Sequence, residues 1–597
     1  MGYNYLASYH YFSLESLTMN LFPFVRCIAN LLFVLTLVVS ISQAAEPAPV
    51  RMESVGVAMR DGIVLATDIY QVGQAKAPVV VMRTPYNKSR VTNVAERFAR
   101  EGYIVVVQDC RGTFKSKGDL IPYNNEGQDG FDAIEWVYRQ SWCNGRIGMW
   151  GSSYVGATQW QAAAEKPPGL VTISPTATWS SFYRNLYLGG AVRLSLIAKW
   201  AGGNSTKPVN AKVTDQWDAA LMHLPLSEMD TKIGWPIPWL TGMLTHNKPD
   251  GYWNRLNLTN QITDLDLSVL HVVGYYDFFS RESVDNFMIM QKKASKTIIR
   301  KQQQLILGPW DHGTIGKNKV GDIDFGPNAI WDPVEANVDW FNRFLKQDAK
   351  ALEKPFFPVR YFSVGDNTWN EAGTWPPEGF ENTAFYFHSN GNANGVKGDG
   401  VLNLDAPELD ETADSFKADP ANPVPALPIT EKRPLHLAHW APVDQRQIEE
   451  RKDVLVYTSK PLDKPLRFAG NPKAELFVST DTKDADWVVK LIDVAPDGFS
   501  YNLVVGILRG SFRDSVLMPK EMKPGQVYKI IVDLGPIAAE LPKGHSLRVQ
   551  VCGSYFPLFD RNTNTAEGPF SKTTVIATEK VYHQQDMASR IILPCKK

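Results

Sequence analysis

From residue 55 to residue 346, continuous apolar runs alternate with segments that carry apolar residues at helical spacing. Among the apolar runs are residues 78–84, 103–109, 170–174 and 267–274. Such runs are typical of strands that are buried on both faces of a sheet. Helical spacing is found at 91–101, 130–139 and 332–346. Strands that alternate with helices predict a mostly parallel α/β sheet, in which reactive groups collect at the carboxyl ends of strands.

The alternation of strands and helices lapses between residues 192 and 264, where helical runs are rich in Trp, Leu and Met. We predict a helical cap inserted over the sheet, so that 46–191 and 265–354 are the two parts of one α/β domain. From residue 355 onward, short alternating runs are separated by turn residues. This pattern predicts an all-β sandwich of the jelly-roll type over 355–597. We expect it to pack on the α/β domain and to form a wall of its cleft.

One strand-to-helix junction carries a candidate nucleophile. The apolar run 147–150 is followed at once by small residues and then by a helical pattern. A serine on a sharp turn between a strand and a helix is the nucleophile elbow of α/β-hydrolases, and Ser153 occupies that tip. Gly151 and Gly156 leave room for the crowded backbone. The second glycine comes one residue later than in the usual elbow pattern, because Val155 occupies its place.

Two strand ends downstream of Ser153 carry the residues that a serine nucleophile needs. Acyl transfer by serine requires a base within hydrogen-bond reach and a carboxylate that orients the base. Asp277 follows the strand 267–274, and His312 follows the strand predicted at 301–307. Their order along the chain, Ser, Asp and His, is that of α/β-hydrolases. We therefore predict a catalytic triad of Ser153, Asp277 and His312.

Several further motifs resemble one known family, that of cocaine esterase and X-prolyl dipeptidyl aminopeptidase, which includes glutaryl acylases and α-amino acid ester hydrolases. The matching segments are 83–86, 109–118, 151–156, 308–312, 453–457, 493–498 and 556–562. The resemblance covers nearly everything that follows residue 45.

The resemblance implies a role for each matched residue. Ser153 attacks the carbonyl carbon, His312 transfers the proton, and Asp277 holds the imidazole. The hydroxyl of Tyr86 and the backbone N–H of Tyr154 form the oxyanion hole. The alternative for Tyr86 is a plain core tyrosine. The implied activity is that of a serine hydrolase that cleaves ester or amide bonds of small acyl substrates through an acyl-enzyme.

The residues after Asp277 bear on the substrate. They are Phe278, Phe279, Ser280 and Arg281, and the only acidic residue nearby is Glu282. A free α-ammonium group finds little compensating charge in such a segment, so an apolar or neutral acyl group fits better. Arg281 is a candidate to bind a substrate carboxylate of the glutaryl type, although a surface arginine is the simpler interpretation.

Two rival functions stay open at this point. The first is an X-Pro dipeptidyl-peptidase, which releases Xaa-Pro dipeptides from the N-terminus of a peptide. The second is a non-catalytic binding protein, in which the β-sandwich holds a glycan or another surface.

Composition and charge limit the kinds of partner that the protein is expected to bind. The apolar content of 44% and the charged content of 21% are those of an ordinary globular protein. A net charge of −1 gives no electrostatic reason to expect a nucleic acid or an anionic membrane as a partner. No cysteine pair has the spacing of a metal site, and we predict neither a metal nor an organic cofactor. The expected partner is a small-molecule ester, an amide or a short peptide, and a homo-oligomer is compatible with the sequence.

The N-terminal segment resembles an export signal. An apolar run at 31–41 is preceded by Arg26 and followed by small residues at 42–45. We predict a secretory signal peptide over 1–45 and a secreted or periplasmic protein without a membrane anchor after cleavage. The true start is either Met1 or Met19.

The cysteines that follow the predicted signal peptide are even in number: Cys110, Cys143, Cys552 and Cys595. An exported chain permits disulfides. Proximity in the sequence favours Cys110 with Cys143 and Cys552 with Cys595, among three ways of pairing them.

Overall fold

A computed structural model of the chain describes residues 49–208, 211–408, 410–435 and 440–597. The predicted signal peptide lies outside these residues. Pro49–Lys597 form one compact unit. Within the described ranges, every helix is too short or too polar to cross a membrane.

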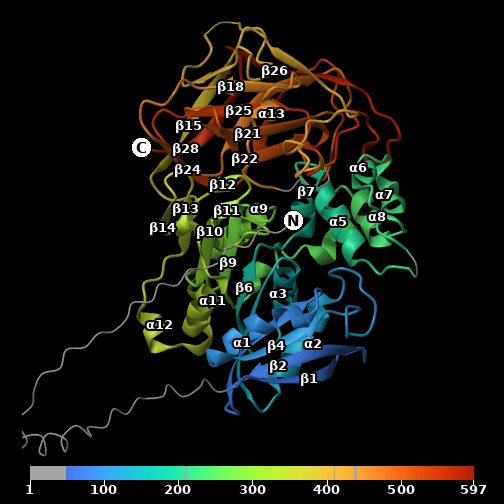
Figure 1. Cartoon of the computed structure of the whole chain (residues 1–597), viewed down its shortest axis with the longest axis vertical. Coiled ribbons are helices and arrows are strands. Elements are labelled where there is room, and N and C mark those ends of the chain that lie inside the picture. Colours follow the sequence, from blue (N-terminus) through green and yellow to red (C-terminus); the bar gives the residue numbers. More distant parts are fainter. Residues whose placement is uncertain (1–48, 209–210, 409, 436–439) are drawn as a thin grey trace, which may run out of the picture. The chain divides into compact units, whose positions relative to one another are not determined.

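The first part of this unit is built on a ten-stranded mixed sheet with the order β1-β2-β4-β3-β5-β6-β9-β10-β13-β14 (Figure 1). Its strands are β1 (Arg51–Ala58), β2 (Val64–Gln71), β3 (Ala77–Thr84), β4 (Ile104–Asp109), β5 (Cys143–Ser152), β6 (Leu170–Thr176), β9 (Ser268–Tyr276), β10 (Gln303–Asp311), β13 (Val359–Ser363) and β14 (Thr368–Ala372). Neighbours from β4 to β13 are parallel, and β1, β2 and β14 run antiparallel to their neighbours. The predicted mostly parallel α/β sheet is confirmed, and the domain is α/β-hydrolase-like.

Helices cover both faces of this sheet. They include α1 (Thr92–Arg100), α2 (Glu126–Tyr138), α3 (Tyr154–Ala164), α9 (Ser280–Lys293) and α11 (Pro333–Phe341). Along β3, Val80 packs in the hydrophobic cluster of Phe98 from α1 and Phe341 from α11. The next residue, Val81, packs in the cluster of Trp160 from α3. Because successive strand residues face opposite sides, both must be apolar, which explains the continuous apolar runs.

Helices also fill the segment between β6 and β9, as the sequence predicts. They are α4 (Phe182–Leu186), α5 (Leu194–Asn204), α6 (Trp217–Leu221), α7 (Met229–Ile233) and α8 (Pro238–Thr245), with short 3₁₀ turns at Leu226–Glu228, Gly251–Leu256 and Ile262–Asp264. The pair β7 (Tyr187–Leu188) and β8 (Ala191–Val192) precedes α5. The Trp, Leu and Met residues of these helices form a hydrophobic cluster that also includes Tyr154 and Phe279.

Strands β13 and β14 correct the sequence-based interpretation of residues 358–364 as part of the sandwich. β13 pairs in parallel with β10, with Leu305 opposite Val359, and so extends the hydrolase sheet. An outer strand and a sandwich strand both alternate buried and exposed positions. Arg360 is indeed partly exposed between the buried residues Val359 and Tyr361. The alternation alone therefore cannot assign the strand to one sheet or the other.

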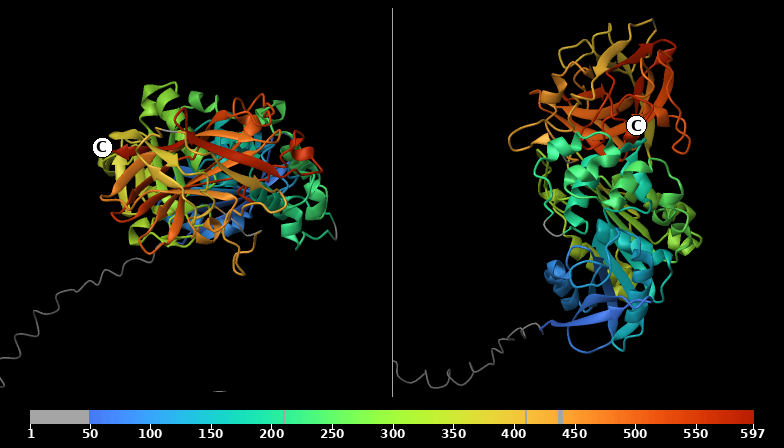
Figure 2. Two further views of the ribbon diagram at one scale, coloured as in Figure 1. Left: turned by 90° about the horizontal axis from the view of Figure 1, so that it is seen from above. Right: turned by 90° about the vertical axis from the view of Figure 1, so that its right-hand side faces the viewer.

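The rest of the chain forms a β-rich domain around one fourteen-stranded sheet (Figure 2). Its strands are β15 (Phe380–His388), β16 (Val401–Asn403), β17 (Asp414–Ala418), β18 (Val454–Thr458), β19 (Leu466–Gly470), β20 (Lys473–Thr480), β21 (Asp486–Val494), β22 (Ser500–Arg509), β23 (Tyr528–Asp533), β24 (Ile537–Leu541), β25 (Ser546–Cys552), β26 (Ala577–Gln584), β27 (Met587–Ala588) and β28 (Arg590–Lys596). A single hydrophobic cluster runs from Phe341 and Val272 of the hydrolase part to Trp487 and Val551 of the β-rich part. The two parts therefore share one interior.

The four cysteines in the described residues are all buried and free, so the pairings favoured by sequence proximity are wrong. Cys110 follows the carboxyl end of β4, whereas Cys143 opens β5 at its amino end. Since these strands belong to the parallel part of the sheet, one thiol lies at the carboxyl ends of the strands and the other at their amino ends. Cys552 ends β25 and Cys595 lies in β28, and β18, β16 and β15 separate these strands in the sheet.

Candidate active site

Ser153 occupies a strained turn between β5 and α3. Its backbone has φ +60° and ψ −124°, in the left-handed half of the map that a residue with a side chain seldom adopts. A Cβ at Gly151 meets Cγ1 of Val155 at 2.2 Å, and one at Gly156 meets Cγ2 of Thr178 at 2.7 Å. Both glycines are therefore required by close packing, and the strand-to-helix turn predicted from the sequence is confirmed.

Asp277 and His312 follow β9 and β10, which are adjacent parallel strands. Nδ1 of His312 lies 2.8 Å from Oδ2 of the buried Asp277. The other carboxylate oxygen of Asp277 accepts a hydrogen bond of 2.8 Å from the backbone N–H of Phe279. Since Nδ1 of the neutral ring donates to the carboxylate, Nε2 is left as the proton acceptor.

Burial lowers the pKa of His312, but the charge and hydrogen bond of Asp277 outweigh it, so the pKa is raised above 6.5. The carboxylate thus makes the imidazole a stronger base than it is in water.

A cavity of about 320 Å³ is lined by both Ser153 and His312. Its lining is Tyr86, Tyr123, Ser153, Phe182, Asn185, Leu186, Leu196, Ile197, Trp200, Phe278, Phe279 and His312. All of these residues precede the β-rich domain, so the expectation that the sandwich walls the cleft is wrong for this cavity. The volume suits a small acyl group, and most of the lining is apolar.

The hydroxyl of Tyr86 reaches the nucleophile. It accepts a hydrogen bond of 3.0 Å from Nε1 of Trp200 and makes another with the side chain of Ser153. Burial raises the pKa of the Tyr86 phenol, and the two hydrogen bonds oppose that shift. The phenol therefore keeps its proton at neutral pH and stays a hydrogen-bond donor.

Tyr154 contributes its backbone to the site, while its side chain is buried in the core. The hydroxyl donates to Oε1 of Glu126 at 2.9 Å and accepts from the backbone N–H of Tyr123 at 2.9 Å. As the first residue of α3, Tyr154 has an N–H without an intrahelical acceptor. This N–H lies beside Ser153, where an oxyanion hole needs a donor.

Sequence reasoning did not single out Trp200 or Tyr123, two of the aromatic residues that line this cavity. The Trp200 ring stacks near Tyr154, at 5.9 Å between centroids, and near Tyr123, at 6.2 Å. Phe278 lies 4.3 Å from the imidazole of His312, again between centroids. The helical pattern of 192–264 identifies Trp200 as an apolar helix residue, but it carries no signal for what the indole N–H contacts.

A buried ion pair below the elbow was also missed. Nη1 of Arg83 lies 2.8 Å from Oε2 of Glu126, and both side chains are almost fully buried. Glu126 also accepts the Tyr154 hydroxyl, so it connects α2 to the start of α3. Arg83 therefore has a structural role three residues before Tyr86.

Arg193 links the loop of Asp277 to the β-rich domain. Its Nη1 donates to the backbone oxygen of Phe278. The guanidinium lies 5.7 Å from the ring of Trp440 and 5.9 Å from that of Phe559. Burial, with repulsion from Arg281, lowers the pKa of Arg193 to about 9, while Asp277 and Glu282 raise it. The β-rich domain thus contacts the active site indirectly, through this side chain.

Arg281 and Glu282 face away from the cavity. Arg281 pairs with Asp533 of the β-rich domain at 2.7 Å, and Glu282 pairs with Arg184 at 2.9 Å. Both line a separate groove of about 450 Å³. The structure therefore gives no support to Arg281 as a ligand for a glutaryl carboxylate.

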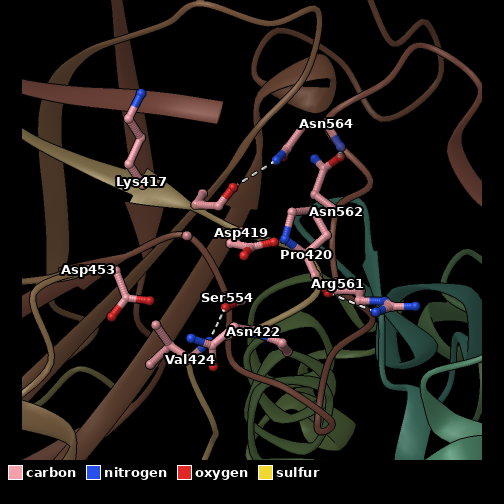
Figure 3. A pocket seen from close by; sticks show the side chains of 13 residues that line it. Lys417, Asp419, Pro420, Asn422, Val424, Asp453, Ser554, Arg561, Asn562 and Asn564 are labelled. Atoms are coloured by element: carbon pink, nitrogen blue, oxygen red, sulfur yellow. Dashed lines mark hydrogen bonds between the residues drawn. The ribbon is translucent and has the colours of Figure 1, made fainter. Parts of the chain in front are cut away.

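Another pocket lies within the β-rich domain, among side chains that include Asp419, Asp453 and Arg561 (Figure 3). Its volume of about 10 Å³ is that of a single water molecule. It is too small for an acyl substrate, so it is not a candidate active site.

Comparisons with known proteins agree with this geometry. Residues 61–314 match the X-Pro dipeptidyl-peptidase (S15 family), and residues 354–592 match the X-Pro dipeptidyl-peptidase C-terminal non-catalytic domain. Cocaine esterase from Rhodococcus sp. (strain MB1 Bresler) is 33% identical over 579 residues, which cover 91% of this chain and 98% of that protein. The chain belongs to the family of cocaine esterase and X-Pro dipeptidyl-peptidase. It is therefore a hydrolase, and the interpretation as a non-catalytic binding protein is wrong.

Solved structures of the family share the whole fold. An aminopeptidase from the marine sediment archaeon Thaumarchaeota archaeon has a TM-score of 0.81 and 26% identity, over 92% of this chain and 97% of that chain. An α-amino acid ester hydrolase has a TM-score of 0.79 and 25% identity, over the same shares. The resemblance seen in the sequence motifs is confirmed.

Proposed function

We propose that the protein is a secreted serine hydrolase that cleaves ester or amide bonds of small acyl substrates through an acyl-enzyme at Ser153. The observation that carries the proposal is a single cavity lined by both a strained serine and a carboxylate-bound imidazole. Export is proposed from the signal-like segment at 1–45.

Each side chain has a step in the proposed mechanism. Nε2 of His312 takes the proton from Ser153 as Oγ attacks the carbonyl carbon. The imidazolium then returns this proton to the departing alcohol or amine, and the C–O or C–N bond breaks. A water molecule, activated by the same imidazole, hydrolyses the acyl-enzyme. Asp277 keeps the ring in place and stabilises its positive charge in both steps.

The negative charge of the tetrahedral intermediate falls on the former carbonyl oxygen. We assign its stabilisation to the phenol of Tyr86 and the backbone N–H of Tyr154. Both are held by partners outside the reaction, Trp200 for the phenol and helix α3 for the N–H. Donors fixed before the charge develops cost no reorganisation, which is why such a site accelerates the reaction.

The lining of the cavity favours an apolar or neutral acyl group. No Asp, Glu, Lys or Arg is among the residues that line it. A charged acyl group therefore loses its hydration without gaining a partner.

We assign the helices between β8 and β9 as a cap that closes this cavity, and the β-rich domain as a jelly roll that supports it.

The second candidate is an X-Pro dipeptidyl-peptidase, which the family match favours. Such an enzyme must bind the free ammonium group of its substrate, and a buried ammonium needs a carboxylate. Glu282, the acidic residue that follows Asp277 most closely, pairs with Arg184 away from the cavity. Esters and neutral amides are therefore the better substrates.

Labelling with a fluorophosphonate probe tests the proposal. We expect one equivalent of label on the wild type and none on Ser153→Ala, with loss of hydrolysis by a factor on the order of 10⁶. A screen of aliphatic p-nitrophenyl esters, glutaryl amides and Gly-Pro-p-nitroanilide then separates the candidates. Faster cleavage of Gly-Pro-p-nitroanilide than of the esters overturns the ester assignment, and undiminished activity of Ser153→Ala overturns the mechanism.

A further inference from the structure

The segment 556–562 of the β-rich domain carries a sequence motif that the proposed mechanism does not use. Within it, the buried Asp560 contacts the hydrolase part. Its Oδ1 accepts a 2.7 Å hydrogen bond from the backbone N–H of Val192, and its own N–H donates to the Val192 oxygen at 2.9 Å. Asp560 therefore holds both polar groups of the Val192 backbone, as a neighbouring strand would.

The carboxylate of Asp560 is itself held in place by Arg509 of β22. Nη1 of Arg509 donates to Oδ2 of Asp560 at 3.1 Å, while Nε and Nη2 bind the two carboxylate oxygens of Asp486, both at 2.9 Å. The backbone N–H of Arg509 donates to the oxygen of Gly189, in the turn between β7 and β8, at 2.8 Å. Charge-assisted bonds of this kind fix direction as well as distance, so Asp560 meets Val192 in one orientation.

The residue that follows Val192 is Arg193, the link to the active site described above. Its side chain donates to the backbone oxygen of Phe278, and its guanidinium lies 5.9 Å from the ring of Phe559. Two adjacent residues of the β-rich domain thus hold two adjacent residues of the hydrolase part, since Phe559 precedes Asp560. A shift of the backbone at Val192 would carry the guanidinium away from Phe278.

Helix α5, which begins after Arg193, depends on the same segment. Arg193 occupies the N-cap position, where no side-chain oxygen caps the helix. The backbone N–H of Ser195, in the first turn, donates instead to the oxygen of Pro557 at 3.0 Å. The segment 556–562 therefore anchors the chain on both sides of Arg193.

The contact of Arg193 with Phe278 bears on the chemistry because Phe278 directly follows Asp277. Oδ2 of Asp277 lies 2.8 Å from Nδ1 of His312, and this geometry depends on the loop that carries the carboxylate. A misplacement of about 1 Å, caused far from the reacting atoms, can cost about 10²-fold in rate.

We propose that Asp560 is a positioning residue for catalysis: it fixes the backbone beside Arg193 and so keeps the loop of Asp277 in place against the imidazole. The β-rich domain then contributes to the reaction without lining the cavity of Ser153. This inference rests on the proposed function, because it takes His312 as the base.

The pH profile of kcat/KM for p-nitrophenyl butyrate tests the inference. Asp560→Ala removes the acceptor of the Val192 N–H, and we expect kcat/KM to fall by about 10- to 100-fold. The midpoint of the profile should move to lower pH by about half a unit or more, because Asp277 raises the pKa of His312 and a looser loop weakens that effect. A merely structural loss lowers the amount of active enzyme and leaves the midpoint in place.

The double variant shows whether the effect passes through Arg193. If it does, Asp560→Ala moves the midpoint no further in the Arg193→Met background. An equal additional shift in that background overturns the inference, as does an unmoved midpoint in Asp560→Ala.

Asp414→Ala is the matched control. Asp414 is also buried and also accepts a backbone N–H, that of Ala393 at 2.8 Å. Its side-chain partners belong to the β-rich domain: Ser389, Tyr457 and His583. The variant should lower Tm without moving the midpoint, and a shift as large as that of Asp560→Ala overturns the inference.

Asp560→Asn guards against an alanine variant that fails to fold. It keeps the volume and an oxygen for the Val192 N–H but loses the charge that Arg509 binds, so a smaller shift in the same direction is expected. If the alanine variant does not fold, an unmoved midpoint in Asp560→Asn overturns the inference.

Fluorophosphonate labelling keeps the two proposals apart. A wild type that neither labels nor hydrolyses esters defeats the proposed function. A wild type that labels and hydrolyses esters, together with an unmoved midpoint in a folded Asp560 variant, defeats only the role of Asp560.

Discussion

The indole N–H of Trp200 donates a 3.0 Å hydrogen bond to the phenol oxygen of Tyr86. A bond accepted at this oxygen polarises the phenol and leaves its own proton free to point toward Ser153. We expect Trp200→Phe to lower kcat about tenfold with little change in KM, and Tyr86→Phe to lower it by roughly 10²–10³.

The double variant separates this role from simple packing. If Trp200 acts through Tyr86, then Trp200→Phe costs nothing further in the Tyr86→Phe background. An equal loss of kcat in both backgrounds contradicts the relationship.

The pH dependence of catalysis reports on His312. The proposed base must be neutral, so kcat/KM should rise with pH through the pKa of His312, which lies above 6.5. Asp277→Asn removes the charge that raises this pKa. The midpoint of the profile should then move to lower pH, while the plateau rate falls by about 10⁴. A midpoint that stays in place or moves to higher pH in Asp277→Asn contradicts the assignment.

A buried histidine in the β-rich domain should make stability depend on pH. Nε2 of His583 lies 2.9 Å from Asp414, and Nδ1 lies 2.9 Å from Glu411. Burial lowers the pKa of His583, but these carboxylates outweigh it and raise the pKa above 6.5. The stabilisation is therefore complete below pH 6.5 and is lost as pH rises through the folded-state pKa.

Thermal unfolding of His583→Gln tests this dependence. The difference in Tm between the wild type and the variant should shrink as pH rises above 6.5. The control is His246→Gln, because the ion pair of this histidine with Asp250 is exposed on both sides and is screened by solvent. A difference that grows with pH means that the histidine is held neutral in the folded state.

Gly151 is expected to tolerate no side chain. Its φ of +146° and the 2.2 Å approach of Val155 both oppose a Cβ. Gly151→Ala should destabilise the protein by about 1–3 kcal/mol or more and abolish labelling of Ser153. The control is Gly203→Ala in α5, which meets nothing within 4 Å and should be neutral or stabilising by about 0.5–1 kcal/mol. Full labelling of Gly151→Ala argues against the strained elbow.

Arg193 should matter for catalysis although it lies outside the cavity lining. Arg193→Met keeps the apolar stem but removes the hydrogen bond to Phe278 and the cation beside Trp440. We expect a lower kcat and slower labelling, because the loop of Asp277 loosens. Arg281→Met is the matched control, since Arg281 also joins the hydrolase part to the β-rich domain, through Asp533 and the backbone oxygen of Val505, but it does not donate to Phe278. Equal effects of the two variants exclude a special role for Arg193.

The positions of Ser153, Asp277 and His312 were predictable because each follows a strand of a mainly parallel sheet. Parallel strands end at the same edge, so the order of apolar runs along the chain already implies that these residues meet. Gly151 was predictable for a similar reason, because a turn of this kind forces a close approach of the backbone.

The role of Trp200 was not predictable from the sequence. It lies on α5, where periodicity separates the apolar face from the polar face but does not say what a single indole N–H contacts. The predicted cysteine pairings were wrong because nearness in the sequence ignores strand direction. Cys110 lies at the carboxyl end of β4, whereas Cys143 lies at the amino end of the parallel strand β5.

The interior common to the hydrolase part and the β-rich part limits how this protein can be divided. A cut near residue 354 removes β13 from the hydrolase sheet and exposes apolar side chains of the cluster that includes Phe341 and Trp487. Neither fragment is then a soluble building block for a chimera. Any engineering that exchanges the β-rich half for that of a relative must also exchange the residues facing it, Arg193 among them.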